Sequence, residues 1–148
     1  MPRPGLHDYF MGIANAVALR STCTRHRIGA VIVDSAGRIL STGYNGAPRG
    51  LAHCLDLGCM RDLRNIKSGT DHQYCRSVHA EQNSLAQAGD RDKLFGATLY
   101  CNYSPCVICA KMIINSGITK IVYTKEYPDA LAKEMLMEAG VALIEWKI

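Results

Sequence analysis

The sequence lacks any long hydrophobic run, and no apolar stretch approaches the roughly 18 residues that a membrane-spanning helix needs. Its first ten residues, MPRPGLHDYF, contain one arginine and no apolar block, so they do not have the pattern of a secretory signal peptide. These two absences predict a cytoplasmic protein that has no membrane partner.

A strong charge of either sign is also missing. The 17 basic and 13 acidic residues leave a formal net charge of +4, which is too small to indicate nucleic-acid binding. The basic residues are scattered except at Arg25-His26-Arg27, a cluster that is compatible with a small anionic substrate. A chain of 148 residues that is 48% apolar can bury its own core, which predicts a single domain over residues 1–148.

Cysteine, in contrast, is abundant. The chain has seven cysteines, and an odd number cannot pair completely within one chain. Because a cytoplasmic location disfavours disulfides, this content indicates metal binding or catalysis.

Hydrophobic periodicity predicts helices and strands that alternate along the chain. A helical stripe comes first, and a β-branched run, a turn at residues 34–37 and a second strand then indicate a β-hairpin. The predicted helices are residues 6–20, 79–88, 105–115 and 130–139, and the predicted strands are residues 28–33, 38–42, 97–101, 118–124 and 141–146. This order predicts an α/β fold in which helices are layered against a mixed sheet.

Residues 44–78 show no such periodicity. They are rich in glycine and polar residues and would form an unusually long loop. Long loops in compact domains are usually functional or held by a metal, so a role of one of these kinds is expected here.

Two short motifs carry the strongest chemical signal: His79-Ala80-Glu81 and Pro105-Cys106-Val107-Ile108-Cys109. Cysteines at i and i+3 lie on one face of a helix and can bind one metal ion, and Pro105 fits the first helical turn. With His79 they provide three ligands, which leaves the fourth position of a tetrahedral zinc site open for water, as in catalytic zinc sites.

Glu81 is the candidate general base and acid beside this zinc. Residues i and i+2 of a regular helix point to different sides, so His79 and Glu81 can converge only if His79 lies before the helix begins. The alternative is that His79 and Glu81 form a solvated helix start and that Cys106 and Cys109 are ordinary core thiols.

The two motifs resemble the zinc deaminase signature H-x-E followed by P-C-x-x-C. Other segments narrow the resemblance to deoxycytidylate (dCMP) deaminases, among the cytidine-deaminase-like enzymes. These segments extend over about residues 8–146 and comprise Cys23, residues 27–31, 43–48, 79–83, 104–106, 127–132 and 139–141. The resemblance implies a three-layer α/β/α sandwich with a mixed sheet of about five strands.

The resemblance also implies the reaction, which is hydrolytic deamination of dCMP to dUMP and ammonia, with dUMP supplying thymidylate synthesis. In that mechanism Glu81 takes a proton from a zinc-bound water, passes it to N3 of cytosine and then helps ammonia to leave. Many relatives are homo-hexamers that dCTP activates and dTTP inhibits, so a homo-oligomer and this allosteric regulation are expected.

Several residues are candidates for binding the nucleotide. By resemblance, Asn45 binds the sugar hydroxyl, while Ala80 and Tyr127 also belong to the substrate site. From the residues alone, Asn45-Gly46 is equally typical of a type I′ turn, and Tyr127 could be a half-exposed packing residue. A phosphate also needs cationic or amide partners, and the candidates are Arg25, Arg27 and Arg49, each of which could instead be a solvated surface charge.

Of the remaining cysteines, Cys101 lies in an apolar strand and is predicted to be a buried core thiol. Four others, the number that a closed structural zinc site requires, are Cys23, Cys54, Cys59 and Cys75. Some members of the resembled family carry a second zinc at positions matching Cys23 and Cys54. A second zinc is therefore expected, with His72 or His53 as a substitute ligand and free loop thiols as the alternative.

Three rival functions stay open. A nucleoside or base deaminase would act without a phosphate, which an assay of dCMP against deoxycytidine would distinguish. A non-catalytic zinc module that binds nucleic acid or protein would have no need of Glu81. A tRNA-adenosine editing enzyme would need a larger basic surface than this chain has.

Overall fold

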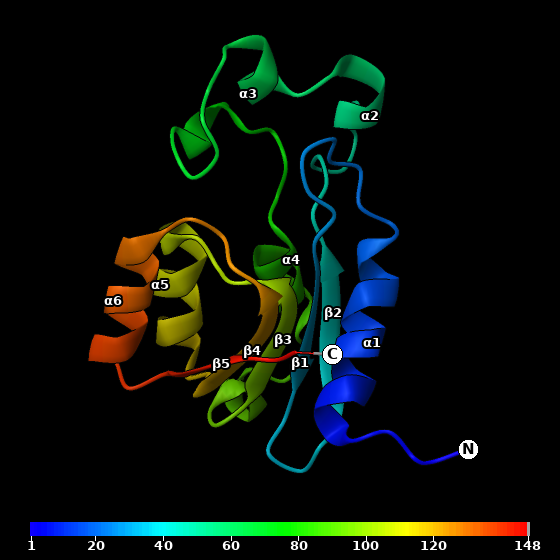
Figure 1. Ribbon diagram of the computed structural model, residues 1–148, viewed down its shortest axis with the longest axis vertical. Coiled ribbons are helices and arrows are strands. Elements are labelled where there is room, and N and C mark those ends of the chain that lie inside the picture. The colour runs from blue at the N-terminus through cyan, green and yellow to red at the C-terminus, as the bar shows by residue number, and fades with distance from the viewer. Residues whose placement is uncertain (148) are drawn as a thin grey trace.

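The computed structural model describes residues 1–147, and its centre is a mixed sheet of five strands in the order β2-β1-β3-β4-β5 (Figure 1). β1 pairs antiparallel with β2 and β3, whereas β3, β4 and β5 are parallel. The strands are β1 Gly29–Val33, β2 Ile39–Tyr44, β3 Thr98–Tyr103, β4 Lys120–Lys125 and β5 Ala142–Glu145. The predicted mixed five-stranded sheet is confirmed, and each strand lies within two residues of its expected bounds.

Helices cover both faces of this sheet. Helix α1 (Leu6–Ala18) packs on one face, where Val31 and Val33 of β1 join its core. Helices α4 (Ala80–Gln87), α5 (Val107–Ser116) and α6 (Ala130–Glu138) cover the other face, where Ala30 and Ile32 point (Figure 1). This arrangement confirms the three-layer α/β/α sandwich. Within residues 1–147, no helix has the length and apolar character to cross a membrane.

Gly43 allows β2 and α4 to pack backbone against backbone. A Cβ atom at this position would lie 2.5 Å from the carbonyl oxygen of Ala80 and 2.5 Å from the amide nitrogen of Ser84. Since real Cβ atoms do not approach backbone atoms so closely, a side chain here would push α4 off the sheet. The position of the first turn of α4 therefore depends on this glycine.

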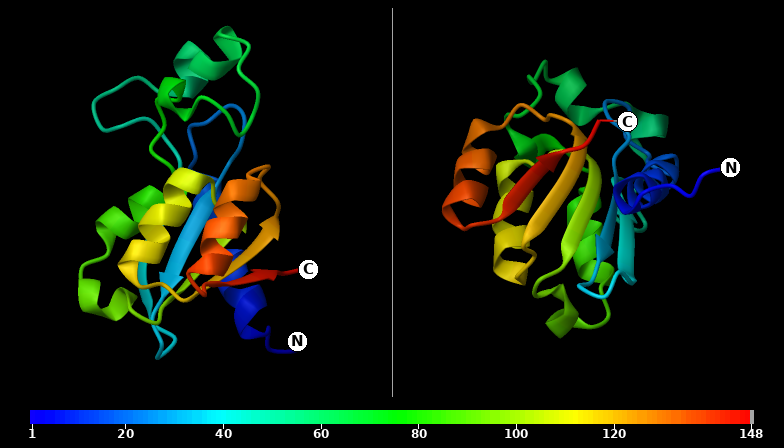
Figure 2. Two further views of the ribbon diagram at one scale, coloured as in Figure 1. Left: turned by 90° about the vertical axis from the view of Figure 1, so that its left-hand side faces the viewer. Right: turned by 60° about the horizontal axis from the view of Figure 1, so that its bottom comes forward.

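Residues 46–78, here called the cap segment, rise beyond one end of the sheet (Figure 2). The segment contains three short helical elements that the sequence did not predict: α2 (Cys54–Leu57), α3 (Met60–Leu63) and a 3-10 turn, η1 (His72–Tyr74). A second 3-10 turn, η2 (Arg91–Leu94), follows α4. Elements of three or four residues are too short to show hydrophobic periodicity, which is why they were missed.

The base of the cap segment is closed by an isolated antiparallel bridge between Gly46 and Val78. The amide of Gly46 donates to Val78 (3.1 Å), and the amide of Val78 donates to Gly46 (2.8 Å). Neither Asn45 nor Gly46 has a positive φ, so the type I′ turn that Asn45-Gly46 suggested does not form. The chain instead continues from β2 in an extended conformation, and Gly46 pairs with Val78, the residue that precedes His79.

Candidate active site

His79 lies immediately before helix α4, as convergence with Glu81 requires. It is the N-cap residue, with φ −71° and ψ 155°, and the helix begins at Ala80. Its backbone N–H donates to Oε1 of Gln82 (2.8 Å), which fixes the start of the helix. His79 and Glu81 consequently line the same cavity, and the geometric condition set by the sequence is met.

The two cysteines of the second motif occupy the start of α5. Cys106 is the N-cap, with φ −73° and ψ 169°, and Cys109 lies in the first turn. The helix begins at Val107, so Pro105 precedes it and does not occupy its first turn, contrary to the prediction. Asp129 accepts a hydrogen bond from the Val107 amide (2.7 Å) and another from the Ala132 amide (3.1 Å), and it thereby joins the starts of α5 and α6.

His79, Cys106 and Cys109 form a compact cluster of potential metal ligands. Nδ1 of His79 lies 3.2 Å from Sγ of Cys109 and 3.5 Å from Sγ of Cys106. In the part of the chain that the structure describes, these residues form the only group of three such side chains whose ligand atoms all lie within 4.8 Å of one another. One imidazole and two thiols at this spacing suit a tetrahedral zinc site that has one open position.

The electrostatics of the cluster favour a thiolate beside an imidazolium when no metal is bound. A hydrogen bond with Cys109 and the nearby His79 lower the pKa of Cys106 to about 4, against the effect of burial. Burial alone would lower the pKa of His79, but hydrogen bonds with Cys106 and Cys75 raise it to about 10. The thiolate is the form of a cysteine side chain that binds zinc.

Glu81 places a buried carboxyl group beside this cluster. Its side chain is 4% exposed, and its Oε1 atom is buried without a hydrogen-bond partner. Burial raises the pKa of Glu81 to about 7, although the positive charge of His79 acts in the opposite direction. A carboxyl group with such a pKa can both accept and donate a proton near neutral pH.

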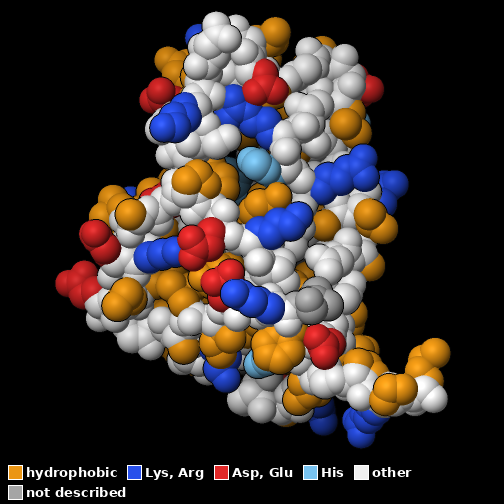
Figure 3. Space-filling view, in the orientation of Figure 1, with side chains coloured by type: hydrophobic (Ala, Val, Ile, Leu, Met, Phe, Trp, Pro, Cys, Tyr) orange, Lys and Arg blue, Asp and Glu red, His pale blue; other side chains and the backbone are white. Residues whose placement is uncertain are grey.

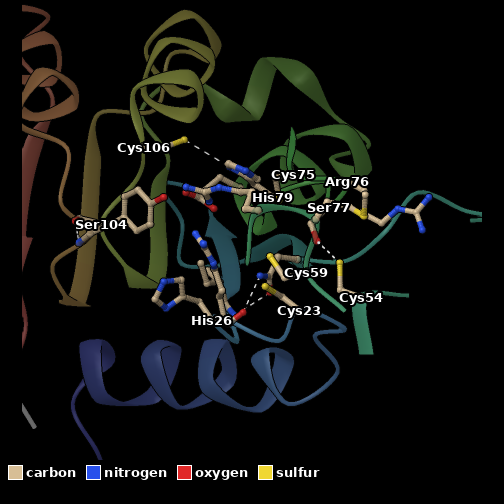
Figure 4. A pocket seen from close by; sticks show the side chains of 17 residues that line it. Cys23, His26, Cys54, Cys59, Cys75, Arg76, Ser77, His79, Ser104 and Cys106 are labelled. Carbon is tan, nitrogen blue, oxygen red and sulfur yellow. Dashed lines mark hydrogen bonds between the residues drawn. The ribbon is translucent and has the colours of Figure 1, made fainter. Parts of the chain in front are cut away.

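The cavity that contains these groups lies between the sandwich and the cap segment. Figure 3, in the orientation of Figure 1, shows a histidine side chain in a hollow below the cap segment, with Lys and Arg side chains above and below it. Figure 4 shows His79 and Cys106 on one side of the cavity, Cys23, His26 and Cys59 on another, and Cys54 close to Ser77. The described lining residues are Cys23, Arg25, His26, Ile28, Asn45, Cys54, Cys59, Met60, Arg61, Cys75, Arg76, Ser77, His79, Glu81, Ser104, Cys106 and Tyr127.

Asn45 lines the cavity but also holds a neighbouring loop together. Its Oδ1 accepts hydrogen bonds from the Ser21 hydroxyl (2.5 Å) and the Ile28 amide (2.9 Å), and its Nδ2 donates to the His26 carbonyl (2.8 Å). The side chain is 5% exposed. Asn45 therefore fixes residues 21–28, the loop that carries Arg25, and keeps one N–H free to donate.

Tyr127 is 9% exposed, so it is not the half-exposed packing residue that was one alternative. Its hydroxyl accepts a hydrogen bond from the Gly69 amide of the cap segment (3.0 Å), and its own amide donates to the Ser104 hydroxyl (2.8 Å). Tyr127 thus connects the cap segment to the edge of the cavity.

Of the three arginines that were candidates for binding a phosphate, one lines the cavity and two do not. Arg25 lines the cavity, whereas Arg27 and Arg49 are exposed and are not among the lining residues. Ala80 is completely buried and does not line the cavity either. Sequence reasoning missed Arg61, which lines the cavity and is 5% exposed; in the sequence it is one of several charged residues in an aperiodic stretch.

The four cysteines expected to hold a second zinc also line this cavity. Cys23 comes from the loop between α1 and β1, and the other three come from separate parts of the cap segment. Among the described residues, their sulfur atoms do not form a group of three ligands within 4.8 Å. Burial raises the pKa of Cys54, and Cys23, Cys75 and Cys59 raise it further.

His72 lies next to the metal cluster, with its ring centroid 5.7 Å from that of His79, and His53 is exposed. Cys101 is fully buried, as predicted.

Comparisons with known proteins agree with this geometry. Residues 4–125 match the family model described as the cytidine and deoxycytidylate deaminase zinc-binding region. A deoxycytidylate deaminase of Mycobacterium phage D29 is 44% identical over 131 residues, which is 85% of this chain and 99% of the phage protein. The deoxycytidylate deaminase of Saccharomyces cerevisiae is 40% identical over 147 residues, which is 95% of this chain and 45% of the yeast protein. The chain therefore spans about half the length of its yeast relatives.

Solved structures give the same result. The dCMP deaminase of cyanophage S-TIM5 in its apo form superimposes with a TM-score of 0.76 at 28% identity, covering 98% of this chain and 100% of the phage chain. The complex of that enzyme with dCMP and dUMP superimposes with a TM-score of 0.75 at 27% identity. Because the family model covers most of the chain and a relative matches along almost its whole length, this protein belongs to the zinc-binding cytidine and deoxycytidylate deaminase family.

Proposed function

We propose that this chain deaminates dCMP by hydrolysis, giving dUMP and ammonia, and so supplies the precursor of thymidylate. The observation that carries the proposal is the buried carboxyl group of Glu81, whose Oε1 atom has no hydrogen-bond partner, beside a cluster of three potential zinc ligands. A structural zinc site would need four ligands and no free carboxyl group. The deoxycytidylate deaminases among the relatives supply the substrate class.

His79, Cys106 and Cys109 are the residues that would hold the zinc. Their mutual distances fit one tetrahedral ion, and the low pKa of Cys106 suits a thiolate ligand. When bound, zinc would act as a Lewis acid that lowers the pKa of water to about 7. The N-cap positions of His79 and Cys106 orient both side chains, and Asp129 fixes the start of α5 behind them.

Glu81 performs the proton transfers in this proposal. Its carboxylate accepts a proton from the attacking water, delivers a proton to N3 of the cytosine ring and then assists the departure of the amino group from C4 as ammonia. The net change is addition of one water and release of one ammonia. Burial raises the pKa of this carboxyl group in the metal-free protein, and one carboxyl group can accept and donate a proton in sequence.

The nucleotide is expected to lie with its base at Glu81 and its phosphate toward the cap segment. Arg25 and Tyr127 line that end of the cavity, and Asn45 keeps one N–H free for the sugar hydroxyl. Arg27 and Arg49 are exposed, so the geometry supports Arg25 rather than these two as a phosphate ligand. The proposed contacts distinguish a nucleotide deaminase from a nucleoside deaminase.

The zinc-loaded protein is expected to prefer dCMP to deoxycytidine by roughly 10- to 150-fold in kcat/KM. One buried charge-assisted hydrogen bond contributes about 1.5–3 kcal/mol, which corresponds to this ratio. The measurement is steady-state kinetics on dCMP and deoxycytidine side by side, with CMP and dCTP as comparison substrates. Equal values for dCMP and deoxycytidine would favour the nucleoside deaminase instead.

We also propose a second, structural zinc held by Cys23, Cys54, Cys59 and Cys75. All four leucines of the cap segment are exposed, so it buries little apolar surface to offset its ordering entropy, which is about 1–2 kcal/mol per residue for the backbone alone. All four cysteines line one cavity, so a single ion could draw their sulfur atoms together from its walls. His72 is the substitute ligand, because both of its ring nitrogens are buried without a partner.

Cys54→Ser is expected to lower the zinc content from about two ions to about one per chain and to make the cap segment more sensitive to protease. Elemental analysis of metal-replete protein and limited proteolysis provide the two measurements. Leu55→Ala, an exposed neighbour on the same short helix, is the matched control and should change neither. A single zinc in the unmodified protein would contradict the proposal.

The remaining expectations stand as proposals with direct tests. A homo-hexamer regulated by dCTP and dTTP would bury some of the large apolar side chains that are exposed in this chain, such as Phe95 (69%) and Met137 (74%). Sedimentation velocity of the purified protein tests the assembly, and kinetics with added dCTP or dTTP test the regulation. A cytoplasmic location and a single catalytic domain over residues 1–148 complete the proposal.

A further inference from the structure

Arg61 is a buried cation that lacks a negative partner. It belongs to α3 of the cap segment and is 5% exposed, and within residues 1–147 it takes part in no ion pair. One of its terminal nitrogens, Nη2, donates to the carbonyls of Lys67 (3.0 Å) and Thr70 (2.8 Å). Its Nε atom is buried without an acceptor. Arginine is rarely buried to this degree unless an anion compensates its charge.

Arg25 lines the same cavity and also has a buried donor atom without an acceptor. Its Nε pairs with Asp62 (2.5 Å) and its Nη2 donates to the Ile66 carbonyl, but its Nη1 is buried without a partner. His26 also lines the cavity but cannot compensate these cations, because a histidine side chain is either neutral or positive. Burial lowers its pKa, and Arg25 and Arg61 lower it further, which favours the neutral form. The cavity therefore contains two guanidinium groups, each with a donor atom that has no acceptor.

Both arginines hold the same stretch of the cap segment. Arg25 contacts Asp62 and Ile66, Arg61 contacts Lys67 and Thr70, and the amide of Gly69 donates to Tyr127. Every one of these contacts falls within residues 62–70. A ligand that binds the free donors of Arg25 and Arg61 would therefore act on this stretch directly.

We propose that Arg61 is a phosphate-binding residue that acts with Arg25, and that the 5′-phosphate of the nucleotide fixes residues 62–70 of the cap segment over the active site. This inference rests on the proposed function and extends it to a residue that sequence reasoning missed. A phosphate dianion supplies the missing negative charge and offers separate oxygen acceptors to two guanidinium groups. The contact between the phosphate and these two arginines would then both select the nucleotide over the nucleoside and order the cap segment.

The kinetic test uses Arg61→Gln in the zinc-loaded full chain. Its kcat/KM for dCMP is expected to fall by roughly 10- to 150-fold more than its kcat/KM for deoxycytidine, which loses only the support that Arg61 gives to the cap segment. Arg61→Lys, which keeps the charge but loses the planar fork, should be intermediate. Arg64→Gln, an exposed arginine at the end of the same helix, is the matched control and should behave as unmodified protein.

A purely structural role for Arg61 would reduce both substrates equally, and that result would overturn the proposal. Unchanged dCMP kinetics in Arg61→Gln would overturn it as well. These comparisons also separate it from the proposed function, because a protein that turned over dCMP well but ignored Arg61 would refute only the inference.

Amide hydrogen exchange tests the same idea without turnover, first in the unmodified protein and then in the two variants. Addition of 2-deoxyribose 5-phosphate to the unmodified, zinc-loaded protein is expected to slow exchange in residues 62–70, whereas 2-deoxyribose is not. Arg61→Gln should lose this protection, and Arg64→Gln should keep it. If the sugar phosphate gave no protection of residues 62–70, the proposal would fail even if Arg61→Gln did not fold.

Discussion

Glu81→Gln is expected to reduce dCMP turnover toward the upper end of the roughly 10²- to 10⁴-fold range of general acid–base catalysis. The amide has nearly the shape of the carboxyl group but cannot accept a proton, and the proposal assigns several successive transfers to this one residue. The zinc content should not change, because Glu81 lies beside the cluster and is not one of its three ligands. Steady-state kinetics and elemental analysis of the same preparation measure both quantities.

The fold of this variant needs its own control because Glu81 is buried. Replacement of a buried carboxyl group by a neutral amide should leave the melting temperature the same or raise it slightly, since no charge has to be desolvated. Glu126→Gln, at an exposed residue that pairs with Lys133, should keep full turnover. Turnover near the unmodified value in Glu81→Gln would remove Glu81 from the mechanism.

Cys109→Ala is expected to lower the zinc content by about one ion per chain and to abolish detectable deamination. Changes to residues that merely support a metal ligand already cost about 10- to 100-fold in affinity or activity. Removal of a ligand should therefore cost more than about 100-fold in zinc affinity. Zinc titration against a chelator of known affinity, followed by the dCMP assay, measures the effect.

Cys101→Ala provides a control in the same core. Cys101 and Cys109 are both 0% exposed and belong to the same hydrophobic cluster, but Cys101 is not part of the ligand group. Each variant leaves a small cavity of similar size, so the two should lose similar packing energy. If Cys101→Ala lost zinc as Cys109→Ala does, general destabilisation rather than ligand removal would explain both.

The sandwich could be predicted from the sequence because its signals are local. The β-branched run in β1, whose residues are all buried, and the apolar positions of α1 mark their elements without reference to the rest of the chain. The metal cluster was predictable for a related reason. His79, Cys106 and Cys109 lie in two short motifs, so only the arrangement of these two motifs had to be inferred.

The cap segment could not be predicted in this way. Its helices α2 and α3 have four residues each, and contacts between distant residues support them. Arg25 reaches Asp62 and Ile66, and Tyr127 accepts from Gly69, 58 residues away. Arg61 was missed because a buried cation and an exposed one look alike in sequence. Nothing in the Asn45-Gly46 dipeptide indicates that its backbone would pair with Val78.

The pairing between Gly46 and Val78 also limits how far changes inside the cap segment can affect the sandwich. The bridge between Gly46 and Val78 joins the two ends of the cap segment at its base, whatever lies between them. When the ends of a loop are fixed, each doubling of its length costs only about 0.6 kcal/mol of closure entropy. We therefore expect length changes in exposed parts of this segment, away from its contacts with His79 and Tyr127, to leave the strand register unchanged. A graft of residues 47–77 from a homologue, with Gly46 and Val78 kept, is then expected to fold on this sandwich, which circular dichroism and thermal melting of the chimaera would measure.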